Sequence, residues 1–364
     1  MAKDPDSLAK DSVKAWLQES DPRELDRLWQ QANEARRNNV GNEVWLRGLI
    51  EISNHCVRSC AYCGISQCAP ATKKYRMGLK AILVAAKQAL DFGFGTIVLQ
   101  AGEDPGLTGP WMAEAVESIK SKTNLAITLS LGERSETDLK LWRQAGADRY
   151  LLRFETSDIE LYRQIHPNLG RQSDRLAQLD SMRLMGYEIG TGVMIGIPGQ
   201  TWDSLADDLL LFRQFDVDMI GIGPYLEVSG TPLAGELGSR LKSVSGGGQV
   251  PNDDLTTLKA IALARLLCPF ANIPATTALA TINPNDGRSL GLQRGANVVM
   301  PNMTPLEYRV LYQIYPGKAG LHETADISSK KIEGQITSLG RTIGRGPGAS
   351  RRLLAPIQNP IAKS

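Results

Sequence analysis

The sequence predicts an α/β protein built as an eight-stranded (β/α)8 barrel of the TIM type. From Glu43 onward, short apolar runs alternate with amphipathic stretches of helical length, which is the pattern of repeated βα units around a parallel sheet. The apolar runs number eight, the number of strands that closes such a barrel. We expect the strands at residues 44–53, 96–103, 126–133, 149–156, 188–199, 219–228, 274–283 and 296–303.

The segments around these strands predict the organisation of the chain. Residues 6–40 carry apolar side chains at spacings near three and four, which predicts helices. The stretches 79–93 and 173–186 predict helices that end in glycine. Residues 235–254 are rich in Gly and Ser and are expected to form a mobile surface loop, and the basic tail after Gly340 is expected to wrap the barrel or to be partly disordered. We therefore divide the chain into a helical lead-in (1–42), a barrel (43–318) and a C-terminal extension (319–364).

Charge and hydropathy exclude several classes of function. The 41 basic and 39 acidic residues give a formal charge of +2, and no basic run is long enough to follow a phosphate backbone, so we expect no nucleic-acid partner. The charged N-terminus and the lack of any long apolar run predict neither secretion nor a membrane partner, and the cytoplasm is the expected compartment. In that reducing compartment, five cysteines favour metal ligands or catalytic thiols over disulfides.

Polar residues gather toward the end of each predicted strand. In a parallel barrel these ends meet at one mouth, where this architecture builds its active sites. The alternative for each residue is a local role, such as capping the next helix. The side chains expected to converge at that mouth are Gln100, Glu103, Ser130, Glu133, Arg153, Glu155, Thr276, Thr277 and Asn302.

Three cysteines form the most distinctive motif. The stretch "NHCVRSCAYCGISQC" places Cys56, Cys60 and Cys63 at the spacing C-x3-C-x2-C. A structural zinc site needs a fourth ligand, which Cys68, His55 or a distant residue would have to supply. A [4Fe–4S] cluster held by three cysteines instead leaves one iron open to a small molecule. The spacing alone is compatible with either centre.

The position of this motif resembles that of the radical S-adenosylmethionine (radical SAM) enzymes, because it directly follows the first barrel strand and has an aromatic residue, Tyr62, before its last cysteine. The resemblance implies a barrel of the radical SAM kind and one [4Fe–4S] cluster bound by Cys56, Cys60 and Cys63. It also implies S-adenosylmethionine (SAM) as cofactor, reductively cleaved to a 5'-deoxyadenosyl radical. Cys68 and Cys268 are too few for a second all-cysteine cluster, so we expect one cluster.

Further motifs resemble the SAM-binding elements of this family. "QAGED" (100–104) resembles the Gly-Glu element that meets the SAM amino group, and "GVMIGIPGQT" (192–201) the element that lines the adenine. The resemblance places the ribose near Ser130 and Glu133 and pairs Arg175 with the SAM carboxylate. A turn, a solvated charge and a buried strand are the ordinary alternatives. The expected SAM-binding set is Tyr62, Gln100, Gly102, Glu103, Ser130, Glu133, Arg153, Glu155, Arg175, Met194 and Ile195.

Within the family, several stretches between Trp45 and Lys318, such as "GANVVMPNMTP" and "YRVLYQIYPGK", resemble the HydE-type maturases of [FeFe]-hydrogenase. This implies a part in assembling the diiron site of the hydrogenase H-cluster. It also implies a small organometallic or amino-acid-derived substrate, with other hydrogenase maturases and a low-potential electron donor as partners. The candidate substrate-pocket residues are Thr276, Thr277, Met300, Tyr308 and Arg309, although Met300 could simply pack in the barrel.

One residue departs from the family pattern, and two other functions remain open. Phe154 stands where "LLRHET" is usual, so we expect a polar contact near SAM or substrate to be missing or to be supplied by another residue. Biotin synthase and methylornithine synthase share the barrel, so a related enzyme acting on an amino acid or another small molecule is an alternative. An iron–sulfur scaffold or electron carrier without SAM chemistry is the alternative of another class.

Overall fold

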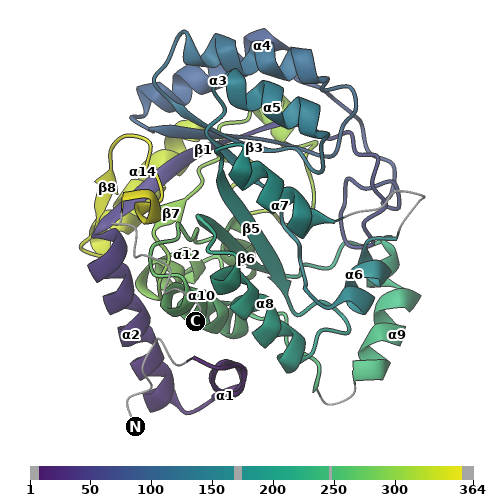
Figure 1. Cartoon of the computed structure of the whole chain (residues 1–364), viewed down its shortest axis with the longest axis vertical. Coiled ribbons are helices and arrows are strands. Elements are labelled where there is room, and N and C mark those ends of the chain that lie inside the picture. The colour runs from purple at the N-terminus through teal and green to yellow at the C-terminus, as the bar shows by residue number, and fades with distance from the viewer. Residues whose placement is uncertain (1–7, 168–173, 246–247, 355–364) are drawn as a thin grey trace, which may run out of the picture.

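The computed structural model describes residues 8–167, 174–245 and 248–354, which fold around a curled, mainly parallel sheet with helices on its outer face (Figure 1). The strands are hydrogen-bonded in the order β6-β5-β4-β3-β2-β1-β7, and β8 also pairs with β1. The strands are β1 Glu43–Ser53, β2 Thr96–Ala101, β3 Ala126–Ser130, β4 Arg149–Leu151, β5 Glu188–Ile195, β6 Met219–Pro224, β7 Val298–Val299 and β8 Thr342–Gly344.

The predicted barrel is confirmed, but its seventh position is filled by a much shorter segment than expected. Residues 272–275 link the two ends of the sheet through single bridges, Met219 with Asn272 and Pro274 with Val298. The expectation of a strand over 274–283 is wrong, since helix α11 occupies Thr277–Ile282. The Thr276 side chain accepts a hydrogen bond from the Leu279 amide and so caps a helix whose centre is Ala-Leu-Ala.

The helices fill the connections between strands, as the pattern predicted. Helix α3 lies within 79–93 and helix α7 within 174–186, which confirms both predictions over the described residues. The helices of the barrel are α3 Leu79–Asp91, α4 Gly109–Lys120, α5 Glu136–Gln144, α6 Ile159–Ile165, α7 Arg175–Leu184, α8 Trp202–Gln214, α9 Glu236–Ser245, α10 Asp254–Leu267, α11, α12 Gly287–Gln293, α13 Leu306–Arg309 and α14 Ala325–Ser338.

The N-terminal helices are confirmed, and one predicted loop is corrected. Helices α1 (Lys10–Gln18) and α2 (Pro22–Val40) pack against α8 and α10 at the outside of the barrel (Figure 1). Within the segment expected to be a loop, 235–254, residues Glu236–Ser245 instead form α9 and Asp254 begins α10, while 246–247 lie outside the described residues. Leu237 and Leu241 of α9 pack on a small apolar cluster with Leu161, and this tertiary packing outweighs the low helix propensity of Gly and Ser. None of the described helices is long and apolar enough to cross a membrane.

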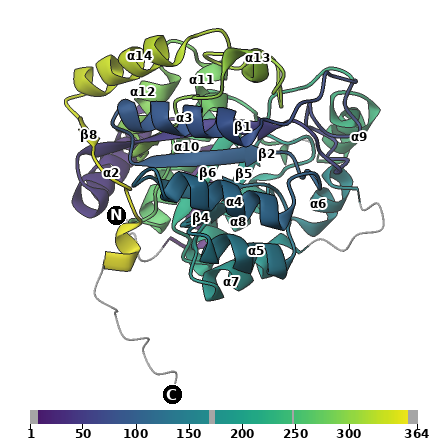
Figure 2. The same cartoon turned by 90° about the horizontal axis from the view of Figure 1, so that it is seen from above.

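The described part of the C-terminal tail closes the amino-terminal mouth of the barrel. After β8, a segment we call the C-terminal strap (residues 345–352) crosses the strand starts, which lie opposite the α6 and α9 side in Figure 2. The Pro347 carbonyl accepts hydrogen bonds from Thr96 and Arg149, and the Gly348 carbonyl accepts from Arg47 and Asn272. The described part of the tail thus wraps the barrel as expected and covers the strand starts. Residues 355–364 lie outside the described ranges.

Candidate active site

The cysteine loop lies at the carboxyl end of β1 and is held against its neighbours by backbone hydrogen bonds. The Val57 amide donates to the Glu103 carbonyl (3.0 Å), and the Ala61 amide donates to the Ile165 carbonyl (2.9 Å). The Tyr62 hydroxyl lies 2.9 Å from Nε2 of His166. The loop is therefore anchored both to the segment after β2 and to the end of α6, at the mouth where the sequence predicted it.

Gly102 permits the close approach of the cysteine loop to the end of β2. A Cβ atom at this position would lie 2.2 Å from the His55 carbonyl oxygen and 2.7 Å from Cβ of Cys56. Any larger residue would push the first cysteine away from the barrel mouth. The contact gives "QAGED" a structural reason that is independent of its resemblance to a SAM-binding element.

The three thiols share an environment that suits a metal cluster. Cys56 and Cys63 line a cavity of about 260 Å³ at the barrel mouth, and Cys60 is buried beside them. Burial, together with the neighbouring cysteines, raises the pKa of Cys60 to about 11 and that of Cys63 to about 12. Cationic metal reverses this effect, because it stabilises the thiolate form that binds it. Three cysteines on one loop beside an accessible cavity therefore fit a [4Fe–4S] cluster with an open iron.

A single metal ion would demand a tighter arrangement. Within the described ranges, no three His, Cys, Asp or Glu side chains are grouped closely enough to hold one ion. A cubane cluster does not require such a group, since each cysteine binds a different iron.

The cavity beside the cysteines collects most of the side chains predicted to bind SAM. Met194 closes its apolar side, and Glu155 and Arg175 contribute charge. Glu155 has φ of +66°, which is strained for a residue with a side chain, and such strain is commonly retained at functional sites. The predicted residues that line the cavity are Tyr62, Gln100, Gly102, Ser130, Arg153, Glu155, Arg175 and Met194.

Charged groups at the edge of this cavity are already linked to each other. Glu133 accepts a hydrogen bond from Nε of Arg175 (2.9 Å) and lies 3.2 Å from Arg58. Arg175 also donates to the Arg153 carbonyl (2.7 Å), and Nε of Arg153 donates to Glu155 (3.1 Å). Arg175 thus has a carboxylate partner within the chain, in addition to any it meets in a ligand.

Three predicted SAM residues are placed behind the cavity wall. Glu103 accepts a hydrogen bond from the Glu133 amide (3.1 Å) and supports that wall with Glu133 itself. Ile195 is fully buried in the main apolar core. The prediction that each contacts SAM stays a prediction, while the contacts described here give each a role in packing or positioning.

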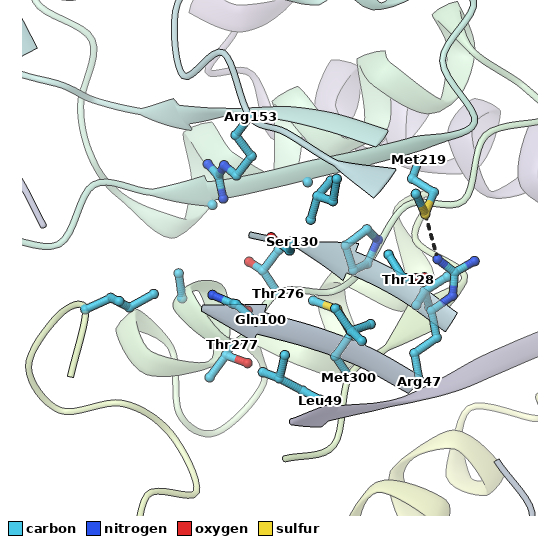
Figure 3. Close-up of a pocket in the computed structure, with 18 of the residues that line it drawn as sticks. Arg47, Leu49, Gln100, Thr128, Ser130, Arg153, Met219, Thr276, Thr277 and Met300 are labelled. Carbon is cyan, nitrogen blue, oxygen red and sulfur yellow. Dashed lines mark hydrogen bonds between the residues drawn. The ribbon is translucent and has the colours of Figure 1, made fainter. Parts of the chain in front are cut away.

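A second cavity, of about 160 Å³, adjoins the first and lies in the barrel lumen. The two cavities share Gln100, Ser130 and Arg153. Three of the five predicted substrate residues, Thr276, Thr277 and Met300, line the lumen (Figure 3). The predicted substrate pocket and the predicted SAM pocket are therefore adjoining spaces.

The other two predicted substrate residues lie elsewhere. Tyr308 packs against Tyr75, with tilted rings whose centroids lie 5.1 Å apart. The buried Arg309 donates to the carbonyls of Asn302 and Thr304 and so ties together the loop after β7. Neither residue lines the lumen.

Sequence reasoning missed the charged residues that point into the lumen from the strands themselves. Arg47 is fully buried, and burial beside Arg149 lowers its pKa to about 9. One of its terminal nitrogens donates to the Met219 sulfur (2.9 Å, Figure 3), and its Nε has no hydrogen-bond partner among the described residues. Glu51, four residues along the same strand, forms a buried ion pair with Lys318. The sequence signal for these lumen charges was an arginine and a glutamate inside the otherwise apolar run "VWLRGLIEIS".

The departure at position 154 falls outside both cavities. Phe154 is 3% exposed and packs on Phe212, with ring centroids 5.6 Å apart. Its aromatic ring belongs to the core on the outer side of the barrel. The predicted loss of a polar contact with SAM or substrate at this position therefore finds no support in the placement of the side chain.

A parallel barrel that carries a three-cysteine loop after its first strand, beside a cavity large enough for a cofactor, has the architecture of a radical SAM enzyme. The model of the Radical SAM superfamily matches residues 50–212. The chain is 44% identical over 330 residues to the [FeFe] hydrogenase maturase subunit HydE of Thermotoga maritima, covering 91% of this chain and 90% of that one. It is 31% identical to 3-methylornithine synthase of Methanosarcina acetivorans, covering 82% of each chain.

Solved structures agree with these relatives. The crystal structure of methylornithine synthase (PylB) superposes with a TM-score of 0.77 at 26% identity, covering 93% of this chain and 94% of that one. The hydrogenase maturase HydG superposes with a TM-score of 0.69 at 16% identity, covering 92% and 71%, which shows a common fold. The chain belongs to the radical SAM superfamily and, within it, to the family of HydE. The predicted family and enzyme class are confirmed.

Proposed function

We propose that this enzyme cleaves SAM reductively and acts in the assembly of the diiron site of the [FeFe]-hydrogenase H-cluster. The observation that carries the proposal is the 44% identity to HydE over 91% of the chain, together with a cysteine loop that fits the cluster. The proposed substrate is a small organometallic or amino-acid-derived molecule, and the proposed partners are other hydrogenase maturases and a low-potential electron donor.

In this proposal Cys56, Cys60 and Cys63 hold one [4Fe–4S] cluster. When bound, the reduced cluster and SAM supply a 5'-deoxyadenosyl radical at the barrel mouth. The side chains that line the 260 Å³ cavity bind and orient SAM, with Tyr62, Met194 and the neighbouring strand ends excluding water from it. Glu103 and Glu133 are positioning residues, because Glu103 lies beside Arg58 and Glu133 holds Arg175, which lines that cavity.

The lumen would bind the substrate beyond SAM, since it continues the same space toward the barrel floor. Arg47 presents a guanidinium there that has no carboxylate partner among the described residues, whereas Arg153 is paired with Glu155 and Glu51 with Lys318. In a buried site of low polarity, an unneutralised guanidinium group favours an anionic ligand. This suits an anionic organometallic species or a carboxylate.

The direct test is maturation in vitro. Apo-[FeFe]-hydrogenase is incubated anaerobically with the other maturases, with or without this protein, and hydrogen evolution is measured. We expect activity to depend on the protein and to be lost with Cys60→Ala. Hydrogenase that matures equally well without the protein would contradict the proposal.

A methylornithine synthase-like activity is the second candidate, because the solved structure of that enzyme superposes over nearly the whole chain. An amino-acid substrate needs a carboxylate for its ammonium group, and Glu51 is already paired with Lys318. Lysine that stimulates formation of 5'-deoxyadenosine would favour this candidate. A scaffold without SAM chemistry predicts instead that SAM leaves the electron paramagnetic resonance spectrum of the reduced cluster unchanged.

A further inference from the structure

A third cavity lies on the flank of the barrel, outside the lumen. It has a volume of about 160 Å³, and we call it the flank chamber. Its walls come from α11, α12, the segment after β7, the loop around Lys318 and α14. These elements lie together on one side of the barrel in Figure 2. None of the predicted SAM-binding residues lines this chamber.

The flank chamber has an excess of positive charge. Arg288, Lys318 and Lys331 line it together with one carboxylate, Glu323. Glu323 accepts a hydrogen bond from Lys331 (3.1 Å), and Lys318 pairs with Glu51. Arg288 makes one long hydrogen bond to Gln335 (3.3 Å), and its buried Nε has no partner among the described residues. A half-buried guanidinium with donors to spare in a polar cavity is suited to a small anion, such as a carboxylate.

The flank chamber adjoins the lumen. Thr277, Met300 and Lys318 line both cavities. The Lys318–Glu51 ion pair stands between them, with Glu51 on the lumen side. Lys318 lies on a loop rather than on a strand, between Gly317 and Gly320, whose φ values are +66° and +74°. Glycines in this conformation allow a loop to change course at low steric cost.

The floor of the lumen is closed by the C-terminal strap, and its mouth is shared with the cavity assigned to SAM. At the floor, the C-terminal strap is tied to Arg47 and Asn272, both of which line the lumen. At the mouth, the lumen opens into the cavity assigned to SAM, and the two share Ser130, Arg153 and Tyr315. Once SAM fills the mouth, a small anion in the lumen therefore has the cofactor at one end and the strap at the other.

We propose, on the basis of the SAM-dependent function above, that the flank chamber is a second anion-binding site and a side passage. A small anion, of the size of a halide or a short carboxylate, enters or leaves the lumen through it while SAM occupies the mouth. Lys318 forms the partition. Arg288 holds the anion on the outer side, and Arg47 attracts it on the inner side.

The test uses bromide as the probe and crystals of the cluster-loaded protein, soaked with and without SAM. Anomalous scattering locates bromide in each cavity. For the wild type with SAM, we expect bromide beside Arg288 in the flank chamber and also in the lumen. Arg288→Gln should lower the chamber occupancy by more than half at the same soak concentration.

Ser328→Trp fills the chamber from α14, and Ser338→Trp on the exposed side of the same helix is the matched control. We expect Ser328→Trp to lose lumen bromide in the presence of SAM and to keep it in the absence of SAM, while Ser338→Trp matches the wild type. Lumen bromide that persists in SAM-loaded Ser328→Trp, or a wild-type chamber without bromide, would overturn the side passage. Crystals that bind no SAM would overturn the proposed function and the need for a passage together, and the SAM density distinguishes the two failures.

Discussion

Asp104 is the residue whose replacement tests most sharply how the cysteine loop is held. Its fully buried carboxylate accepts hydrogen bonds from Oγ of Ser53 (2.6 Å), from Nε and Nη2 of Arg76 (2.7 and 2.8 Å) and from the Gly106 amide (2.8 Å). Ser53 precedes the three cysteines and Arg76 follows them, so one carboxylate fastens both ends of the loop to the end of β2. Burial alone would raise the pKa of Asp104, but the hydrogen bonds from Arg76 and Ser53 lower it below its usual value, and the group is charged.

We predict that Asp104→Asn loosens this loop by about 2–3 kcal/mol. The amide keeps one acceptor oxygen but loses the charge, which weakens two charge-assisted hydrogen bonds worth about 1.5–3 kcal/mol each. The estimate stays below the sum of both because the Arg76 side chain is 43% exposed and can turn to water. Such a change raises the open fraction of the loop roughly 30- to 150-fold.

The assay is the rate of iron release from the reconstituted protein to an iron chelator, followed by absorbance, with iron and sulfide content measured beforehand. We expect faster release from Asp104→Asn by about the factor given above. Asp148→Asn is the control, since Asp148 also joins two elements, through Lys120 (2.7 Å) and the Ile127 amide (2.7 Å), but at the amino-terminal end of the strands. Equal iron release from wild type and Asp104→Asn, with a lower melting temperature for the variant, would show that the carboxylate only stabilises the fold.

Three further predictions concern other buried charges. Arg47→Met should raise the free energy of unfolding by about 1–4 kcal/mol in denaturant titrations, because it removes a buried charge that has no carboxylate partner in the described part of the chain. The same variant should lose substrate-dependent turnover, and a destabilised variant would contradict this reasoning. Lys318→Met should lower the free energy of unfolding by about 3–5 kcal/mol, because it leaves the Glu51 carboxylate without its ion-pair partner. The double variant Lys318→Met, Glu51→Met should recover most of this loss, and strictly additive effects of the two substitutions would refute the coupling. Burial raises the pKa of Asp208 from 3.8 to about 7, so the folded protein binds this proton more tightly than the unfolded chain does. Ionisation of Asp208 should therefore lower the free energy of unfolding as the pH rises from about 4 to 7, by at most about 4 kcal/mol. Asp208→Asn should remove that part of the pH slope, and an unchanged slope would assign it to other groups.

The barrel was predictable because its strands are buried on both faces and therefore read as continuous apolar runs. The end of the seventh predicted strand could not be predicted in this way. The stretch "PATTALATIN" has the apolar and β-branched residues of a strand, but the Thr276 cap starts a helix at Thr277. The helix at 236–245 was hidden by its Gly and Ser content, because only tertiary contacts of Leu237 and Leu241 reveal its buried side.

The candidate site shows the same division. The cysteine spacing and the strand-end residues were readable from the sequence, because the carboxyl ends of parallel strands must meet. Strand alternation places the Ile195 side chain in the core, and its predicted contact with SAM stays a prediction. The Lys318–Glu51 pair could not be predicted, because it joins residues 267 positions apart in the sequence.

The central claim is radical SAM chemistry at the three-cysteine loop, and one measurement tests it most directly. The protein is reconstituted anaerobically with iron and sulfide, reduced with dithionite in the presence of SAM, and analysed for 5'-deoxyadenosine by chromatography beside Cys60→Ala. We predict 5'-deoxyadenosine from the wild type and none from the variant. No product from the wild type, with a cluster spectrum unaffected by SAM, would contradict the claim.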